Sequence, residues 1–537
     1  MKHGIISAPQ PEAVEAGADV LASGGNAIDA AIACALVQTT VDPFMCGIAG
    51  FGSMHVYMPA QGVHECLDFH GRAPLAATPG MWEDLIVAET EDGFGFSLKG
   101  AVNEIGYRAI TTPMTLRAFD TALRRYGSQS LADLLEPAIE HAEKGWIVRP
   151  HVAAYWNEKP AAGRLPHSEF CTRYPATREI YGRPDGGVFG VGERIVNKDM
   201  AETYRRIVEN GVDDFYRGDL AEEILADMQA GGALITRDDL ATVEPRRNEP
   251  LRTTYRGYDI STNQPPGGGV MLLEMLNILE NFDLAAMGHN SPAYIATVSE
   301  AMKVATIDKD NKVGDPEFLD VPLLELTSKD YAALQANRIR DGEKANVVRL
   351  RPGEREEPRD TTHICVADNA GNIVSMTHSL GAPSGVITKG LGFMYNGCMA
   401  VFDPRPGRAG SIAPGKARFT AMCPTLIFKD GRPTHVIGSP GGTFITMAVL
   451  QGILNMLDFG MDAQAAVAAP RFCTTSNTID ITNRILRRTE EELKSMGYPV
   501  RRSPLNYYFG GVHALRLTGN GWDGGADPGR DGMVLTV

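Results

Sequence analysis

One stretch, from Asp360 to Met376, limits what this chain can fold into more than any other. A charged, proline-containing run at 349–360 precedes it and has almost nothing apolar to bury. Two apolar segments follow, separated by the sequence Asp-Asn-Ala-Gly-Asn at 368–372. Asn and Gly supply the positive φ angles that tight turns require. The pattern predicts an exposed segment that leads, at Thr361, into a buried β-hairpin.

An exposed segment that meets a buried strand is also a place where a chain can be cut. Cleavage between Asp360 and Thr361 would leave Thr361 at a new N-terminus, where its own α-amine can take the proton of its hydroxyl. Such an amine has a pKa of about 8 in model compounds, so much of it is unprotonated at neutral pH. The residues alone leave open the alternative of an ordinary hairpin after a surface loop.

The motifs carry a family resemblance. Thr361-Thr362-His363, followed by a strand and an Asp-x-x-Gly-Asn turn, resembles the start of the small subunit of γ-glutamyltranspeptidases. These are N-terminal-nucleophile hydrolases that cleave their own precursor. The segments 24–31, 438–443 and 527–532 resemble further motifs of the family and occur in the family's order, so the resemblance covers nearly the whole chain.

The resemblance implies an α+β fold, the four-layer αββα sandwich of the N-terminal-nucleophile hydrolases. It further implies a large subunit, 1–360, and a small subunit, 361–537, that share one domain. Two subunits from one precursor would then be partners, and a homo-oligomer of such heterodimers is compatible with the family.

The resemblance also assigns the chemistry. Thr361 is the expected nucleophile, and Ser379 occupies the position of a hydroxyl that bonds to the nucleophile's amine in the family. The backbone amides of Gly441 and Gly442 would stabilise the oxyanion, since glycine lets the backbone approach a substrate closely. The implied reaction transfers the acyl group of a small-molecule amide to Thr361 and then to water.

Positions that bind the amino-acid end of a γ-glutamyl group in the family differ here. His70 replaces the arginine for the α-carboxylate, and Arg72 is the nearest arginine. The other changes are Val401 for the aspartate that holds the ammonium, Cys398 for a glutamine, Gly381 for an asparagine, and Thr420-Ala421 for a serine pair. A buried ammonium without a partner costs on the order of several kcal/mol. We therefore expect an acyl group other than the standard γ-glutamyl.

Two alternatives stay open. The chain could be a true glutathione hydrolase or γ-glutamyltransferase in which Arg72 and His70 supply the lost contacts. It could also be a non-catalytic relative that keeps the fold as a scaffold, which would remain a single uncut chain.

Composition excludes other classes. The 43% hydrophobic and 22% charged residues are typical of a globular protein with a large core. A formal charge of −15 argues against nucleic acid or an anionic membrane as a partner. Neither a signal peptide nor a membrane span is predicted. The scattered eight cysteines favour a reduced, cytoplasmic protein without zinc, and no phosphate-binding loop occurs, so we expect no cofactor.

Hydrophobic periodicity predicts the local elements. Helices are expected over 11–22 and 131–144, and strands over 390–396 and 424–428. The turn-rich segment 403–416 is expected to be either a lid over a cleft or an ordinary surface loop.

Overall fold

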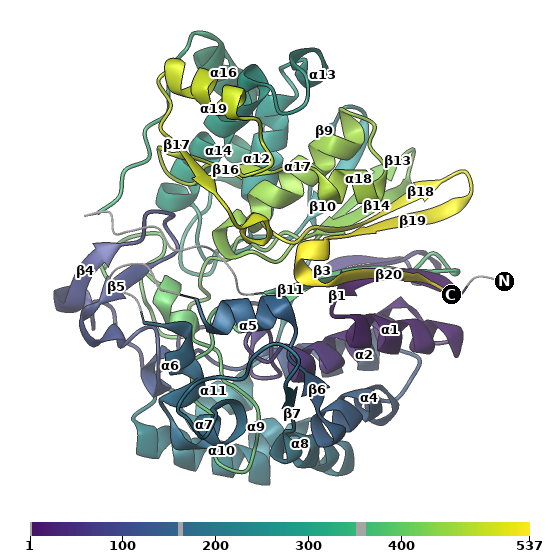
Figure 1. The fold of residues 1–537 in the computed structure, drawn as a ribbon, viewed down its shortest axis with the longest axis vertical. Helices are drawn as coiled ribbons and strands as arrows, with labels where there is room; N and C mark the ends of the chain where they lie inside the picture. Colours follow the sequence, from purple (N-terminus) through teal and green to yellow (C-terminus); the bar gives the residue numbers. More distant parts are fainter. Residues whose placement is uncertain (1–2, 159–164, 351–360) are drawn as a thin grey trace.

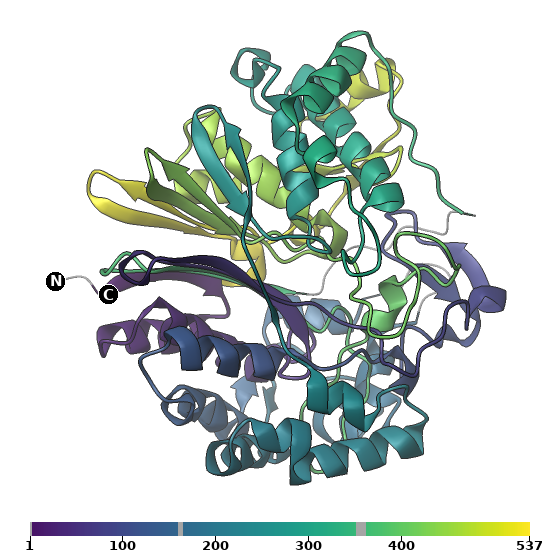
Figure 2. The same ribbon diagram turned by 180° about the vertical axis from the view of Figure 1, so that it is seen from behind.

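The computed structural model describes residues 3–158, 165–350 and 361–537 of the chain. Two β-sheets lie face to face, and helices cover the outer face of each, as the edge-on view shows (Figure 1). The view from behind shows the same order of layers (Figure 2). The predicted four-layer αββα sandwich is therefore confirmed.

The first sheet contains seven antiparallel strands within the described residues. Their order across the sheet is β20 (Gly532–Thr536), β1 (Gly4–Pro9), β11 (Thr362–Asp368), β12 (Ile373–Ser379), β2 (Phe51–Met58), β3 (Val63–Phe69) and β8 (Arg246–Asn248). The hairpin of β11 and β12 thus lies in the middle, between strands from the first part of the chain. Both sides of residue 360 contribute to this sheet.

The second sheet, again counted over the described residues, contains six antiparallel strands. Their order is β19 (Gly521–Ala526), β18 (His513–Thr518), β14 (Arg432–Gly438), β13 (Thr425–Lys429), β10 (Tyr258–Thr262) and β9 (Leu251–Tyr255). Here β9 and β10 come from before residue 360 and the others from after it. Neither part of the chain completes a sheet alone.

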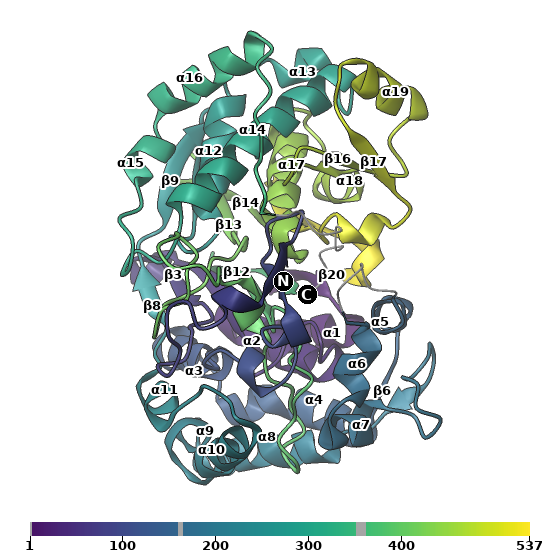
Figure 3. The ribbon, with the colours of Figure 1, turned by 90° about the vertical axis from the view of Figure 1, so that its left-hand side faces the viewer.

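Each sheet is covered on its outer face by its own set of helices. The helices below the first sheet are α1 (Pro11–Ala22), α2 (Ala27–Val41), α3 (Thr115–Tyr126), α4 (Leu131–Lys144), α5 (Pro150–Trp156), α6 (His167–Thr172), α7 (Pro175–Tyr181), α8 (Lys198–Asn210), α9 (Asp213–Arg217), α10 (Asp219–Gly231) and α11 (Arg237–Thr242). Those above the second are α12 (Gly269–Leu279), α13 (Leu284–Met287), α14 (Pro292–Lys312), α15 (Leu323–Leu326), α16 (Lys329–Arg340), α17 (Ile445–Leu457), α18 (Ala463–Ala468) and α19 (Arg487–Ser495) (Figure 3). Among the described residues, no helix is both long and apolar enough to span a membrane.

Helix α2 anchors the central hairpin. Every residue of α2 is buried, and its alanine-rich surface allows close packing against β11 and β12. The side chain of Asn26 accepts hydrogen bonds from the amides of Ile28 and Asp29, which caps the helix. The amide of Ala27, the first residue of α2, donates at 3.0 Å to the side chain of Asp368, the last residue of β11. The helix start and the hairpin turn are therefore fixed to each other.

Most predicted elements agree with the structure, and one is wrong. The helices over 11–22 and 131–144 have the predicted bounds, and β13 is the strand expected over 424–428. No strand forms over 390–396, where only isolated bridges occur, at Tyr395 and Asn396. Both Gly390 and Gly392 adopt positive φ, which interrupts an extended strand.

Candidate active site

Thr361 and Ser379 meet at one end of the central hairpin. In the register of β11 and β12, Thr362 pairs with His378, so the residues just beyond this pair face each other. The Thr361 hydroxyl donates to the Ser379 hydroxyl at 3.2 Å. The Ser379 hydroxyl in turn accepts from the amide of Gly381 at 2.8 Å. The predicted nucleophile and its predicted hydroxyl partner therefore lie together in a buried site.

The backbone of Thr361 is strained. Its φ is +130°, a region that a β-branched residue rarely adopts. Such a conformation costs on the order of 1–3 kcal/mol and persists only where the surrounding structure enforces it. The strain is adjacent to the peptide bond that precedes Thr361. The predicted cleavage residue Asp360 itself lies outside the described residues.

A glycine turn connects β14 to α17 near the same end of the sandwich. The φ angles are +135° at Gly441 and +55° at Gly442, and both backbone conformations favour glycine over other residues. A Cβ on Gly441 would lie 2.8 Å from the Cα of Gly510, which is too close. Just before the turn, a Cβ on Gly438 would lie 2.0 Å from the ring of His363. The turn therefore begins against β11, the strand that directly follows Thr361.

Sequence reasoning missed a loop that packs on this turn. The loop 90–95 connects β4 (Ile86–Glu89) to β5 (Phe96–Leu98). Asp92 accepts a hydrogen bond from the Thr443 hydroxyl at 3.1 Å, and a second from the amide of Phe94 at 3.0 Å. The loop is thus fastened to the residue that directly follows Gly442.

Two of the predicted substrate positions, Gly381 and Cys398, lie beside Ser379, where the Cys398 sulfur donates to the Leu380 carbonyl at 3.2 Å. Gly381 has φ +76°, and a Cβ there would lie 2.7 Å from the Cys398 sulfur. His70 is buried, and its Nε2 lies 3.6 Å from an oxygen of Asp68. Burial lowers the pKa of His70 below the usual range of an imidazole. A neutral His70 cannot replace the family's arginine as a cation at neutral pH.

A second arginine, absent from the sequence-based prediction, lies in this cluster. The Arg418 guanidinium packs over the ring of Phe51 at 4.4 Å and over that of Phe94 at 5.6 Å. One of its nitrogens is 3.6 Å from the position that a Cβ on Gly381 would take. Phe51 is the strand partner of Ser379 between β2 and β12. No local sequence pattern could have indicated this cluster, because its members come from four distant segments.

The remaining predicted substrate residues make other contacts. Thr420 donates its amide to the Pro266 carbonyl at 2.9 Å, and the Ala421 carbonyl accepts from the Thr446 hydroxyl at 2.8 Å. The half-buried Arg72 interacts electrostatically with Arg246, and burial together with this like charge lowers its pKa. None of these contacts is with Thr361.

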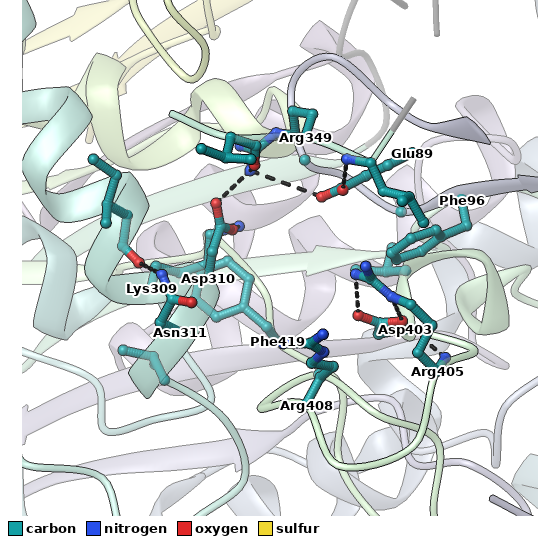
Figure 4. A pocket seen from close by; sticks show the side chains of 18 of the residues that line it. Glu89, Phe96, Lys309, Asp310, Asn311, Arg349, Asp403, Arg405, Arg408 and Phe419 are labelled. Carbon is teal, nitrogen blue, oxygen red and sulfur yellow. Dashed lines mark hydrogen bonds and ion pairs between the residues drawn. The ribbon is translucent and has the colours of Figure 1, made fainter. Parts of the chain in front are cut away.

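Val401 lines a polar cavity of about 420 Å³ next to the 90–95 loop (Figure 4). Its lining includes residues of the turn-rich segment 403–416, which therefore forms one wall of a cavity. Among the lining residues that the structure describes, each carboxylate has a basic partner. The pairs are Asp403 with Arg405 at 2.7 Å, Glu89 with Arg349 at 3.8 Å, and Asp310 with Arg349.

Comparisons with known proteins agree with this arrangement. The family model described as gamma-glutamyltranspeptidase matches residues 13–537. The chain belongs to the γ-glutamyltranspeptidase family. Its members include hydrolytic and transpeptidase enzymes, and the Thr361–Ser379 site lies in the part of the chain that the family model covers.

Individual relatives fall into two groups by name. An "Acylase ACY 1 proenzyme" of Pseudomonas sp. (strain SE83) is 36% identical over 540 residues, which cover 100% of this chain and 94% of the relative. A "Glutathione hydrolase proenzyme" of Bacillus subtilis (strain 168) is 32% identical over 558 residues, covering 100% and 92%.

Solved structures show the same division. The cephalosporin acylase from Bacillus halodurans has a TM-score of 0.86 at 28% identity, covering 99% of this chain and 96% of that one. The Helicobacter pylori γ-glutamyltranspeptidase has a TM-score of 0.55 at 32% identity, covering 63% and 91%. The family resemblance seen in the sequence motifs is thus confirmed over the whole chain.

Proposed function

We propose that this chain is a self-processing N-terminal-threonine amidohydrolase that acts on small-molecule amides through an acyl-enzyme. The observation that carries the proposal is the 3.2 Å contact between the hydroxyls of Thr361 and Ser379, with a strained backbone at Thr361. Relatives named as proenzymes support the self-processing step.

Cleavage of the chain before Thr361 produces the general base of the reaction, which is the α-amine of Thr361. In the uncut chain the nitrogen of Thr361 is a peptide nitrogen and cannot accept a proton. Attack of the Thr361 hydroxyl on the preceding carbonyl forms an ester and frees the amine, and hydrolysis of that ester separates the two chains. Relief of the backbone strain at Thr361 favours this rearrangement.

The mature site then hydrolyses an amide in two steps. The Thr361 oxygen bonds to the substrate carbonyl, its proton passes to the α-amine, and the amine delivers it to the departing nitrogen as the C–N bond breaks. Water cleaves the acyl ester, which restores the hydroxyl and releases the acid. The amides of Gly441 and Gly442 stabilise the oxyanion in both steps.

The acyl group that this site favours lacks an α-ammonium. At the family's aspartate position, Val401 cannot accept a hydrogen bond, and the nearby described carboxylates already have basic partners. The acylase relatives support this assignment, and the glutathione hydrolase relatives define the competing one.

The test is a comparison of amide substrates with the purified, processed protein. We expect turnover of amides without an α-ammonium at a higher kcat/KM than glutathione. A processed protein that hydrolyses glutathione more efficiently than every other amide in the panel would instead be a glutathione hydrolase. An uncut 57.9 kDa chain without activity would support the scaffold alternative.

A further inference from the structure

The segment 42–50, between α2 and β2, packs against the backbone that carries Ser379. A Cβ on Gly50 would lie 2.2 Å from the carbonyl oxygen of Ser379, so glycine is required for this close approach. The amide of Leu380, the next residue, donates to the Met45 carbonyl at 3.2 Å. The backbone position of the predicted catalytic hydroxyl therefore depends on the conformation of this segment.

Asp42 fixes the beginning of the segment. It directly follows α2, and its side chain is only 2% exposed. Its backbone carbonyl accepts from the amide of Met45 at 3.0 Å. Its Oδ2 accepts from the side-chain amide of Gln10 at 2.6 Å and from the ring of His151 at 3.1 Å. The backbone and the side chain of one buried residue thus both hold the start of the segment.

A second route leads from Asp42 to the residue before Ser379. The Oε1 of Gln10 accepts from the side-chain nitrogen of Gln38 at 2.9 Å. Because that nitrogen is the donor, the oxygen of Gln38 is the atom that faces the His378 ring, whose Nε2 donates to it at 2.9 Å. All of these residues are buried. The neighbours of Ser379 on both sides therefore connect to the same carboxylate.

His151 on α5 holds this carboxylate in place. Its two ring nitrogens contact Asp42 at 3.1 Å and Asp531 at 2.9 Å. Two carboxylates can only accept, so both nitrogens donate and the imidazole is a cation. Arg149 adds a second cation, whose Nε lies 3.1 Å from Asp531. The segment 527–532, one of the motifs of the sequence, thereby supplies a residue that orients His151.

We propose that Asp42, held by His151, is a positioning residue for the hydroxyls of Ser379 and Thr361. It contacts neither of them and acts through the backbone and side chains that flank Ser379. A displacement of about 1 Å at a reacting group can cost up to about 10²-fold in rate. This inference rests on the proposed function and deepens it, because it names what keeps the two hydroxyls within contact distance.

The experiment measures kcat and KM with two p-nitroanilides, γ-glutamyl and butyryl. Asp42→Ala should lower kcat by about 10- to 100-fold on each anilide that the wild type hydrolyses. Its KM should change by less than about twofold, because the geometry of the nucleophile affects the transition state more than substrate binding. Asp42→Asn keeps an oxygen that can accept from Gln10 and His151, so it should recover most of the lost kcat.

A second readout does not depend on any added substrate. The same pair of hydroxyls would carry out the cleavage before Thr361, so Asp42→Ala should also slow the separation of the precursor into two chains on a denaturing gel. A wild-type protein that cuts itself but hydrolyses no amide would refute the proposed hydrolase function. The cleavage rate of Asp42→Ala would then still decide the present inference.

The matched control is Asp458, which directly follows α17 as Asp42 follows α2. Its side chain is 4% exposed, pairs with Arg256 at 3.1 Å and accepts from the Tyr255 hydroxyl at 2.7 Å. Asp458→Ala should lower the unfolding free energy to a similar extent and leave kcat and cleavage unchanged. If both alanine variants had the same kcat and the same cleavage rate, the inference would be overturned and the amidohydrolase function would stand.

His151→Gln gives an independent test should Asp42→Ala fail to fold. Glutamine carries no charge and cannot donate to both carboxylates as the imidazolium does, so kcat should fall about three- to tenfold with KM unchanged. Combined with Asp42→Ala, it should cause no further loss, because both substitutions act through one contact. An unchanged kcat in His151→Gln, or losses that simply multiply in the double variant, would overturn the route through Asp42.

Discussion

Asp92 accepts a hydrogen bond of 3.1 Å from the hydroxyl of Thr443, although 351 residues separate the two. The bond joins the 90–95 loop, which carries Phe94, to the turn that contains Gly441 and Gly442. The position of this turn and the position of the ring beside Arg418 are thereby coupled. Under the proposed function, one hydrogen bond between side chains links this loop to the turn that would supply the oxyanion donors.

Removing this bond should reduce activity more than stability. Asp92→Ala leaves the Thr443 hydroxyl without its partner and loosens the loop, so we expect kcat to fall about five- to tenfold. The midpoint of chemical unfolding should change little. Asp84→Ala, an exposed residue of the same region, is the control and should leave kcat unchanged. If the two substitutions had the same effect on kcat, the hydrogen bond between Asp92 and Thr443 would have no role in the site.

Substitutions at the two consecutive threonines should have different consequences. Thr361→Ala removes the hydroxyl and should leave one uncut, inactive chain on a denaturing gel. Thr362 lies on β11 and is fully buried, so Thr362→Ala should cost about 1 kcal/mol of unfolding free energy and still permit processing. Processed, active Thr361→Ala protein would assign the nucleophile elsewhere.

Replacing Gly441 should lower kcat as well as the stability of the protein. Gly441→Ala adds a Cβ 2.8 Å from Gly510 in a positive-φ conformation and would displace the oxyanion donors. We expect a loss of about 10²–10³-fold in kcat, the size seen when one such donor is removed. Gly460 also has positive φ (+65°), but a Cβ there meets nothing within 4 Å. Gly460→Ala should cost only about 1 kcal/mol of stability, with kcat unchanged.

Acid should destabilise the protein through buried neutral imidazoles. Burial lowers the pKa of His378 and of His513 to about 3, and lowers that of His363 well below its usual range. A His with a depressed folded-state pKa stabilises the protein above the unfolded value of about 6.5, and this contribution is lost as the pH falls toward the folded value. We expect the unfolding free energy to fall by up to about 1.4 kcal/mol per pH unit for each imidazole over this window. Equilibrium unfolding between pH 7 and pH 4 measures it.

His151 should behave in the opposite way. Burial alone would lower its pKa, but hydrogen bonds to Asp42 and Asp531 raise it above the usual value. Its contribution is present below about pH 6.5 and is lost as the pH rises through the folded-state value. His151→Gln should therefore remove a decline in stability on the alkaline side of neutrality, whereas His378→Gln should weaken the decline in acid. Identical pH profiles for both variants would contradict these assignments.

The pairing of Thr361 with Ser379 was expected from the family resemblance, and the register of the hairpin explains why the two residues meet. A turn centred on residue 370 places residues whose numbers sum to 740 opposite each other, so Thr361 faces Ser379 once the strands pair. The apolar pattern gave a wrong prediction at 390–396, where Leu391, Phe393 and Tyr395 alternate as in a strand. These side chains pack into the helical layer instead, with the Phe393 ring 5.3 Å from that of Phe215.

Contacts between distant segments could not be predicted in this way. Phe94 reaches Arg418 only because the β4–β5 hairpin folds back across the site, and no periodicity in either segment records it. The predicted pocket residues were carried over from the family's substrate-binding positions. The structure places Gly381 and Cys398 near Ser379, whereas the backbone amide of Thr420 donates to the Pro266 carbonyl. Tertiary packing, which sequence position does not encode, decided which of them meet.

The pairing of β1 with β20 brings Gly4 and Val537 together, with hydrogen bonds of 3.1 and 3.0 Å between their backbones. A short peptide bridge could therefore join these two points without disturbing the first sheet. A circularly permuted chain opened at Thr361 would then begin at the nucleophile. Its α-amine would exist from synthesis, so the catalytic step could be studied in a protein that never has to cut itself.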